Sequence, residues 1–279
     1  MTVTRRGIKL LRQEGLWETV RRGCVFGKNW MDTTVDRSRA HVRTGLHRYR
    51  WGQSTPDSYS IRYVDPASIS HVLAPGFHEE LSRAGTHIKG GDWEQRIADQ
   101  PLIYDGKYEE SFNKQFLVPF DNFVLYESIV EWADHGVPWE ETEFYQWATR
   151  NRERDSWRFE SPEAVRERFA YLTDLYKKIQ SQGYKMQAEL GDSPGGYPAE
   201  YDEILVNIGR NGQFYLDDGR HRICFAKVQN IDTIPIRIFV RHKKWQQIRK
   251  EVATKGKHIL HDLSGIDSSH PDLQDVIEE

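Results

Sequence analysis

Residues 204–240 read ILVNIGRNGQFYLDDGRHRICFAKVQNIDTIPIRIFV and hold the clearest structural pattern in the chain. Apolar residues alternate from Ile204 to Ile208, as in a half-buried strand. Arg210-Asn211-Gly212 predicts a hairpin closed by a type I′ turn, because Asn-Gly tolerates the positive φ angles of that turn. The pattern then predicts a return strand through Phe214 and Leu216, a helix from about Gly219 to Gln229, and a strand at Ile234–Val240. The fold class that follows is α/β (α+β).

A helix is predicted upstream of this stretch, between Ser161 and Gly183. Ser161-Pro162-Glu163 combines an N-cap, a proline in the first turn and an acidic residue near the helix N-terminus. Apolar residues then recur every three or four positions, which places them on one helix face. They are Val165, Phe169, Leu172, Tyr176 and Ile179. Gly183 predicts the helix end, since glycine accepts the conformation that closes a helix.

Asp217-Asp218-Gly219-Arg220-His221-Arg222 joins the return strand to the next helix. Helix N-termini carry free N–H groups that attract anions, and glycine lets an anion approach the backbone closely. Arg220, His221 and Arg222 add donors suited to phosphate oxygens. Asp217 and Asp218 are candidate ligands of a divalent metal, and Asp218 is also a candidate catalytic acceptor of a hydroxyl proton. A surface turn with Asp–Arg pairs explains the same residues equally well.

The segment from Tyr176 to Val240 resembles the nucleotide-binding domain of the ParB/sulfiredoxin superfamily over about 65 residues, roughly a quarter of the chain. The matching elements follow the family order at Lys178–Tyr184, Ile204–Gly209, Asp218–Arg222 and Asn230–Ile236. The motif is most similar to the D-G-H-H-R of free-serine kinases. The resemblance implies that Gly219, His221 and Arg222 hold the phosphates of ATP, ADP or CTP with Mg²⁺, and that Asp218 is the acidic residue.

The chain departs from the superfamily at two points. Sulfiredoxin keeps its nucleophilic cysteine where this chain has Arg220, so that reaction is lost, and Cys224 is interpreted as a buried helix residue. ParB proteins follow the nucleotide domain with a helix-turn-helix domain, and the residues after Val240 are too few for one.

The region 60–157 is rich in aromatic residues and mixed in pattern. It predicts a strand at Ile61–Val64 and a helix at Phe123–Trp132, whereas residues 31–60 are polar and predicted to be irregular. Lys89-Gly90-Gly91-Asp92-Trp93-Glu94 predicts a loop that delivers Asp92 as a second catalytic acid or metal ligand. A plain tight turn is the alternative.

The chain has 279 residues and a net charge of −3, and this charge is unevenly distributed. Residues 1–50 contain 12 Lys or Arg and 4 Asp or Glu, a balance of +8, so the remainder carries −11. A basic arm predicts contact with a polyanion or an anionic membrane surface. A solvated terminus and core packing are the alternatives. Two cysteines exclude a disulfide scaffold, and the lack of a signal peptide or a spanning segment predicts a cytoplasmic protein.

Four regions are therefore predicted: a basic arm (1–50), a mixed region that shapes the acceptor side (60–157), a ParB/sulfiredoxin-like nucleotide-binding module (160–245), and a C-terminal helix with a polar tail (246–279). The leading hypothesis is a nucleotide-dependent phosphotransferase, a kinase acting on a small hydroxyl compound such as a sugar or glycan precursor. One alternative is a non-enzymatic CTP- or ATP-binding regulator that contacts DNA through the basic arm. The other is a scaffold that keeps the fold without the chemistry.

Overall fold

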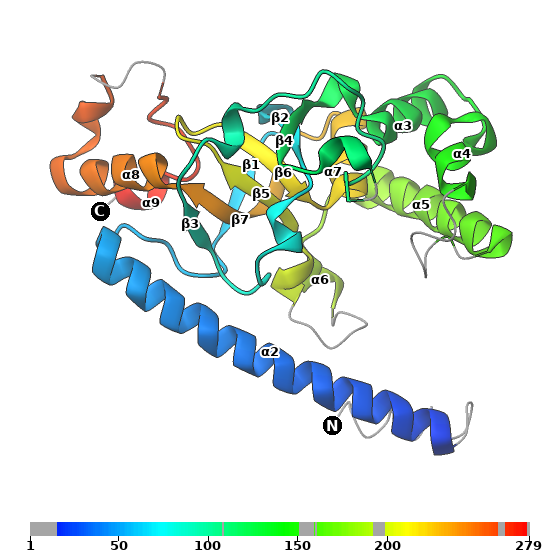
Figure 1. Ribbon diagram of the computed structural model, residues 1–279, viewed down its shortest axis with the longest axis horizontal. Helices are drawn as coiled ribbons and strands as arrows, with labels where there is room; N and C mark the ends of the chain where they lie inside the picture. The colour runs from blue at the N-terminus through cyan, green and yellow to red at the C-terminus, as the bar shows by residue number, and fades with distance from the viewer. Residues whose placement is uncertain are drawn as a thin grey trace.

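The protein is a mixed α/β structure built on one sheet. A computed structural model describes residues 16–107, 109–150, 159, 161–191, 199–261 and 266–277, with residues 16–33 and 261 as backbone only. Within them, seven strands form a mixed sheet in the order β1-β7-β5-β6-β2-β4, and β3 pairs with β7 (Figure 1). The strands are β1 (Ile61–Val64), β2 (Ile69–Ala74), β3 (His87–Lys89), β4 (Phe116–Pro119), β5 (Ile204–Ile208), β6 (Phe214–Asp218) and β7 (Ile234–His242). The predicted α/β class is confirmed.

The centre of the sheet is the β5–β6 hairpin together with β7. β5 pairs antiparallel with β6 and parallel with β7, so that Leu205 lies opposite both Asp218 and Arg237. The predicted type I′ turn is wrong. The Gly209 N–H donates to the Gln213 carbonyl at 2.9 Å, and Gly212 has a φ of +93°, whereas Asn211 does not adopt a positive φ. The connection is therefore longer than the two-residue loop that a type I′ turn requires.

The helices are α2 (Leu16–Trp51), α3 (Val124–Asp134), α4 (Glu143–Arg150), α5 (Pro162–Gln182), α6 (Gln187–Leu190), α7 (Arg220–Val228), α8 (Lys243–Lys255) and α9 (Gln274–Ile277). Short 3-10 helices lie at Pro66–Ser68, Phe77–Glu79, Trp93–Gln95, Glu110–Phe112, Phe120–Asn122, Trp139–Glu141, Ala199–Asp202 and Lys257–His261. Figure 1 shows α3, α4, α5 and α7 together at one end of the sheet, α8 and α9 at the other, and α2 along the lower edge.

The helix predicted between Ser161 and Gly183 forms as expected. The Ser161 Oγ accepts a hydrogen bond from the Ala164 N–H at 3.1 Å, and Gly183 ends α5 with a φ of +76°. Apolar residues of α3, α5 and α7 pack with the strands into the largest core, which includes Phe169 of α5. Cys224 is buried in α7, as predicted, and burial raises the pKa of its thiol.

The opposite side of the sheet is covered by the segment between β2 and β4. Phe77 and Trp93 of this segment pack on strand residues such as Leu205 and Phe239 in a second, smaller core. Because β1–β4 come from the predicted region 60–157 and β5–β7 from the predicted module, the two regions share one sheet. Burial on both faces explains why every residue of β5 and β7 is buried.

The expectation of irregular structure at residues 31–60 is wrong for its first two thirds. The backbone is helical from Leu16 to Trp51 in one element of 36 residues, and residues 1–15 of the predicted arm lie outside the described part. Ala40 and Thr44 of α2 face the body of the protein, where the Ser58 Oγ donates to the Ala40 carbonyl at 3.0 Å. The inward face of α2 is small and polar and its larger apolar residues lie on the solvent side, so the sequence shows no core-facing apolar stripe here, and residues 31–51 were predicted to be irregular.

The predicted polar tail is packed against the sheet over its described residues 266–277. Asp272 and Leu273 are fully buried. The Asp272 carboxylate accepts hydrogen bonds from Arg241 at 2.6 and 2.9 Å and from the Trp245 indole at 2.9 Å. The tail is polar because it neutralises buried arginines, and it therefore belongs to the fold. None of the described helices combines the length and the apolar character needed to cross a bilayer.

Candidate functional site at the β6–α7 turn

Gly219 sets the geometry of the predicted phosphate-binding turn. It is the N-cap of α7 and has a φ of +90° and a ψ of 27°. A Cβ at this position would lie 2.9 Å from the Ile204 Cγ1 and 3.0 Å from the Ile204 Cα. Only glycine combines this conformation with this close approach to β5. The first N–H groups of α7 have no acceptor within the helix, so they are available to an anion.

Replacing Gly219 with alanine is expected to lower the free energy of unfolding by about 2–4 kcal/mol, the sum of left-handed backbone strain and overpacking against Ile204. Urea denaturation measures the loss. Gly136→Ala is the matched control, because Gly136 has a φ of +70° and nothing within 4 Å of its Cβ position. Equal losses in the two variants would show that Ile204 moves aside without cost.

Asp218 is held by two arginines at the start of this turn. An Arg83 Nη2–H donates to Asp218 Oδ2, Arg220 Nη1 lies 3.4 Å from Oδ1, and the Gly219 N–H donates to Oδ1 at 2.8 Å. Burial opposes ionisation of the carboxyl, but the charges of Arg83 and Arg220 outweigh it and hold the pKa of Asp218 well below its usual range. The side chain is therefore a carboxylate at neutral pH and a weak proton acceptor.

Arg220 carries the strongest anion-binding feature of the site. Arg220 is 4% exposed, and its guanidinium carbon lies 5.6 Å from the centre of the Tyr104 ring. Its Nε and Nη2 groups are buried and have no hydrogen-bond partner among the described residues. Buried donors that lack an acceptor destabilise a protein by about 1–3 kcal/mol each. An anion bound at the α7 N-terminus would supply the missing acceptors.

Glu203 extends the polar cluster beyond the predicted motif, next to Arg222 at the end of that motif. Within the described part of the chain, Arg222 Nη1 and Glu203 Oε2 are buried without hydrogen-bond partners, while Glu203 Oε1 accepts from the Gln187 N–H at 2.7 Å. Burial raises the pKa of Glu203, although the charges of Arg222 and Arg237 act in the opposite direction. Burial likewise raises the pKa of Tyr184, which lies beside Arg222, to about 12. A buried carboxyl with a raised pKa suits proton transfer.

Arg237 joins this cluster from β7. It is fully buried between Tyr59 and Tyr201, whose ring centres lie 5.6 and 5.9 Å from its guanidinium carbon. Its Nη1 donates to the Arg83 carbonyl at 2.7 Å, and burial lowers its pKa to about 10. Arg83, Glu203 and Arg237 were not predicted as site residues. Glu203 and Arg237 lie beside or inside predicted strands and Arg83 lies outside every predicted element, so the sequence gives no signal for the partner of any of them.

His221, a predicted phosphate ligand, lies among aromatic side chains. Its ring centre is 5.6 Å from that of Tyr104 and 5.8 Å from that of Phe144, and the residue is 8% exposed. The structure thus brings Gly219, Arg220, His221 and Arg222 to one helix start, with His221 directed toward the aromatic core.

Asp217, a predicted metal ligand, is buried and fully engaged. Its carboxylate accepts from the Phe77 N–H at 2.8 Å, the His78 N–H at 3.1 Å and the Asn207 amide at 2.8 Å, and lies 2.8 Å from His78 Nδ1. Neither Asp217 nor Asp218 keeps an oxygen free of hydrogen bonds or arginine contacts. This pair does not fit a Mg²⁺ site, since Mg²⁺ needs accessible oxygens in near-octahedral geometry.

Asp92, the predicted second acid, lies at the other end of β6. Its Oδ1 accepts from Arg210 Nη2 at 2.7 Å, and Arg210 also pairs with Glu94. Arg210 belongs to the β5–β6 loop, and Asp218 ends β6, so the length of a five-residue strand, about 13 Å, separates them. The structure therefore does not bring Asp92 to Asp218, and Trp93 is buried against Phe77.

These features define a mixed α/β protein with an arginine-rich polar cluster at a strand-to-helix turn. Comparisons with protein-family models, curated proteins and solved structures find no match to the chain. The geometry of the turn is therefore the basis for the functional proposal.

Proposed function

We propose that the β6–α7 turn binds the phosphates of a nucleotide, and that the protein is a phosphotransferase acting on a small hydroxyl compound. One observation carries the proposal: buried guanidinium nitrogens of Arg220 and Arg222 lack acceptors beside the free N–H groups of α7. Guanidinium groups and helix N-termini both favour phosphate oxygens. The resemblance of residues 176–240 to the ParB/sulfiredoxin superfamily supports the same ligand class.

The proposed roles follow from the contacts at the turn. Arg220, Arg222 and the α7 N–H groups hold the phosphates of ATP, ADP or CTP, and Mg²⁺ enters bound to the nucleotide. Asp218 fixes the guanidinium groups of Arg83 and Arg220 and orients the acceptor hydroxyl. In the transfer step the hydroxyl oxygen bonds to phosphorus, the bond to the departing nucleotide breaks, and the hydroxyl proton passes to a carboxylate. Glu203 is the candidate proton acceptor, because its pKa is raised.

A second function is favoured by the state of Asp218. Both of its oxygens are engaged by arginines, an arrangement that suits a binding site without turnover. In this alternative the protein is a CTP- or ATP-binding regulator that contacts DNA through its basic N-terminal arm. The two proposals share the nucleotide site and differ in whether the nucleotide is consumed.

Arg222→Ala is expected to weaken nucleotide binding by about tenfold or more, because it removes a charge-assisted hydrogen bond worth about 1.5–3 kcal/mol. Thermal shift with ATP, ADP, CTP and GTP, with and without Mg²⁺, measures binding, since a ligand of the folded state raises the melting temperature. Arg166→Ala is the control, because Arg166 is an exposed arginine of α5 paired only with Glu163 among the described ion pairs. Unchanged affinity in a folded Arg222→Ala protein would place the site elsewhere. Nucleotide consumption with hydroxyl acceptors separates the enzyme from the regulator.

A further inference from the structure

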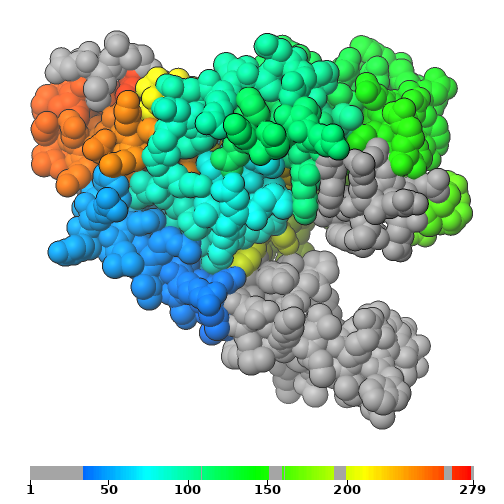
Figure 2. Space-filling view, viewed as in Figure 1, coloured from blue at the N-terminus to red at the C-terminus, as the bar shows by residue number. Residues whose placement is uncertain are grey.

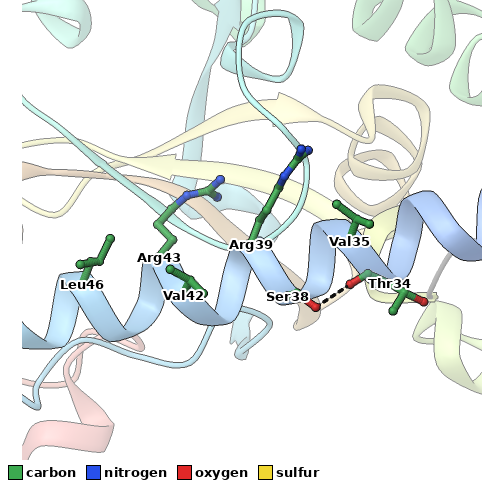
Figure 3. Close-up of a pocket in the computed structure, with 7 residues that line it drawn as sticks. All are labelled: Thr34, Val35, Ser38, Arg39, Val42, Arg43 and Leu46. Carbon is green, nitrogen blue, oxygen red and sulfur yellow. Dashed lines mark hydrogen bonds between the residues drawn. The ribbon is translucent and has the colours of Figure 1, made fainter.

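The solvent side of α2 carries an apolar stripe. Val35, Val42, Leu46 and Tyr49 are 48%, 64%, 63% and 92% exposed, and they are four of the eight large apolar side chains exposed in the described part of the chain. Their spacing of seven, four and three residues places them on one face of a helix. We call these four residues the α2 stripe. Figure 3 shows described residues of α2 that line a hollow along this surface, among them Val35, Val42 and Leu46.

The opposite face of α2 makes the contacts with the rest of the protein. Ala40 and Thr44 are buried there, and the Cβ of Ala40 would lie 2.9 Å from a Cβ built on Gly85. Arg43 Nη1, at one side of the helix, donates to the Ala84 carbonyl at 2.6 Å. The helix therefore directs small and polar side chains inward and larger apolar ones outward, the reverse of an ordinary surface helix. Figure 2 shows the described side chains of α2, in blue, open at the lower edge of the molecule.

Exposed arginines border the stripe on one side. At 100° per residue, Arg39 and Arg50 lie next to it, whereas Arg37 and Arg48 lie near the inward face of the helix and pair with Glu200 and Asp57. Asp36 is the one acidic residue between positions 34 and 51, and it lies 3.7 Å from Arg39. The same three-, four- and seven-residue spacing continues toward the N-terminus of the sequence through Met31, Cys24, Val20 and Trp17.

We propose that the α2 stripe docks on an anionic lipid bilayer, with α2 lying in the plane of the interface. An apolar face with exposed arginines along one side suits such a surface: the apolar side chains enter the headgroup region and the guanidinium groups of Arg39 and Arg50 meet lipid phosphates. A second copy of this chain fits less well, because pairing two α2 stripes would bring arginines against arginines. Nucleic acid would satisfy the arginines but leave the apolar residues exposed to water.

Vesicle sedimentation tests the proposal with the full chain. The probes are vesicles of phosphatidylcholine alone and vesicles with about one-third phosphatidylglycerol, at low ionic strength and at about 1 M salt. We expect binding to the anionic vesicles only, lost at high salt. Val42→Gln combined with Leu46→Gln should weaken it by about tenfold or more, because both side chains leave the interface. Tyr171→Gln is the control, since Tyr171 is 54% exposed on α5.

Both substituted positions are exposed, so the double variant is expected to fold, and circular dichroism verifies this. Absence of vesicle binding by the parent chain would overturn the proposal, as would equal binding by the parent and the double variant. A dimer in analytical ultracentrifugation that the double variant abolishes, without vesicle binding, would assign the stripe to a second copy. Duplex DNA binding without vesicle binding would assign the arginines to nucleic acid. Neither outcome depends on the nucleotide site.

Discussion

Asp218→Asn is expected to lower phosphoryl transfer by the proposed enzyme about 100- to 10,000-fold while nucleotide still binds. The substitution keeps the shape of the side chain and removes the charge that fixes Arg83 and Arg220. Both guanidinium groups then lose the anion that orients them, and the acceptor hydroxyl loses its hydrogen-bond acceptor. Binding is retained because the α7 N–H groups, Arg220 and Arg222 remain. Turnover with each nucleotide and a panel of hydroxyl acceptors measures the first effect, and thermal shift measures the second.

Asp92→Asn is the matched control for this prediction. Asp92 is a carboxylate that also pairs with an arginine, but at the hairpin end of β6. The Asp92→Asn substitution is expected to leave both turnover and nucleotide affinity unchanged. If Asp92→Asn abolished turnover and Asp218→Asn retained it, the reacting groups would lie at the hairpin loop. If neither variant changed anything and no nucleotide were consumed, the binding module would replace the enzyme.

Asp272→Ala is expected to destabilise the fold by about 3–5 kcal/mol, the usual result of removing one partner from a buried ionic cluster. Arg241 and Arg249 are fully buried around this carboxylate, and Arg249 Nη1 lies 3.4 Å from its Oδ2. Without Asp272, the charge of Arg241 has no other described ion-pair partner. Urea denaturation measures the loss. Asp267→Ala, at an exposed tail position whose side chain bonds only to Ser269 among the described hydrogen bonds, should cause a much smaller one. Equal losses would contradict a structural role for the buried cluster.

The same cluster predicts the acid dependence of stability. Burial opposes ionisation of Asp272, but the charges of Arg241 and Arg249 outweigh it and hold its pKa below the ordinary range. A carboxyl whose pKa is lower in the folded state contributes stability above its unfolded pKa of about 3.9, and this stability is lost as the pH falls toward the folded value. Urea midpoints measured from neutral pH downward should therefore fall below about pH 4. Asp272→Asn should start lower at neutral pH and show a weaker fall.

Local sequence rules accounted for several elements and for the predicted turn. The N-cap at Ser161 and the glycine at Gly183 bound α5 as expected. The alternation at Ile204–Ile208 and the Asp218–Arg222 motif lie at the predicted strand and helix start. These features were predictable because capping, periodicity and left-handed glycines depend on atoms only a few residues apart in the chain.

The partners of the buried charges, at that turn and in the tail, depended on the tertiary structure. Arg83 reaches Asp218 across 135 positions, and Asp272 reaches Arg241 across 31. Such contacts follow from strand register and from the packing of distant segments, which local propensity does not encode. Asp92 illustrates the same limit. The two glycines before it are visible in the sequence, but the sequence does not show that this loop lies at the hairpin end of β6, away from Asp218.

Composition by itself determined that the first 50 residues are basic, and it misled on their structure. The region from Met31 to Trp51 reads as polar and irregular because its inward face needs only small residues such as Ala40 to fit beside Gly85. Val35, Val42, Leu46 and Tyr49 face water in the described structure, so burial could not organise them into a core pattern. The sequence by itself thus determined the fold class and the residues of the strand-to-helix turn. Only the tertiary structure decided which charges meet there and which face of α2 stays exposed, because both depend on contacts between segments far apart in the chain.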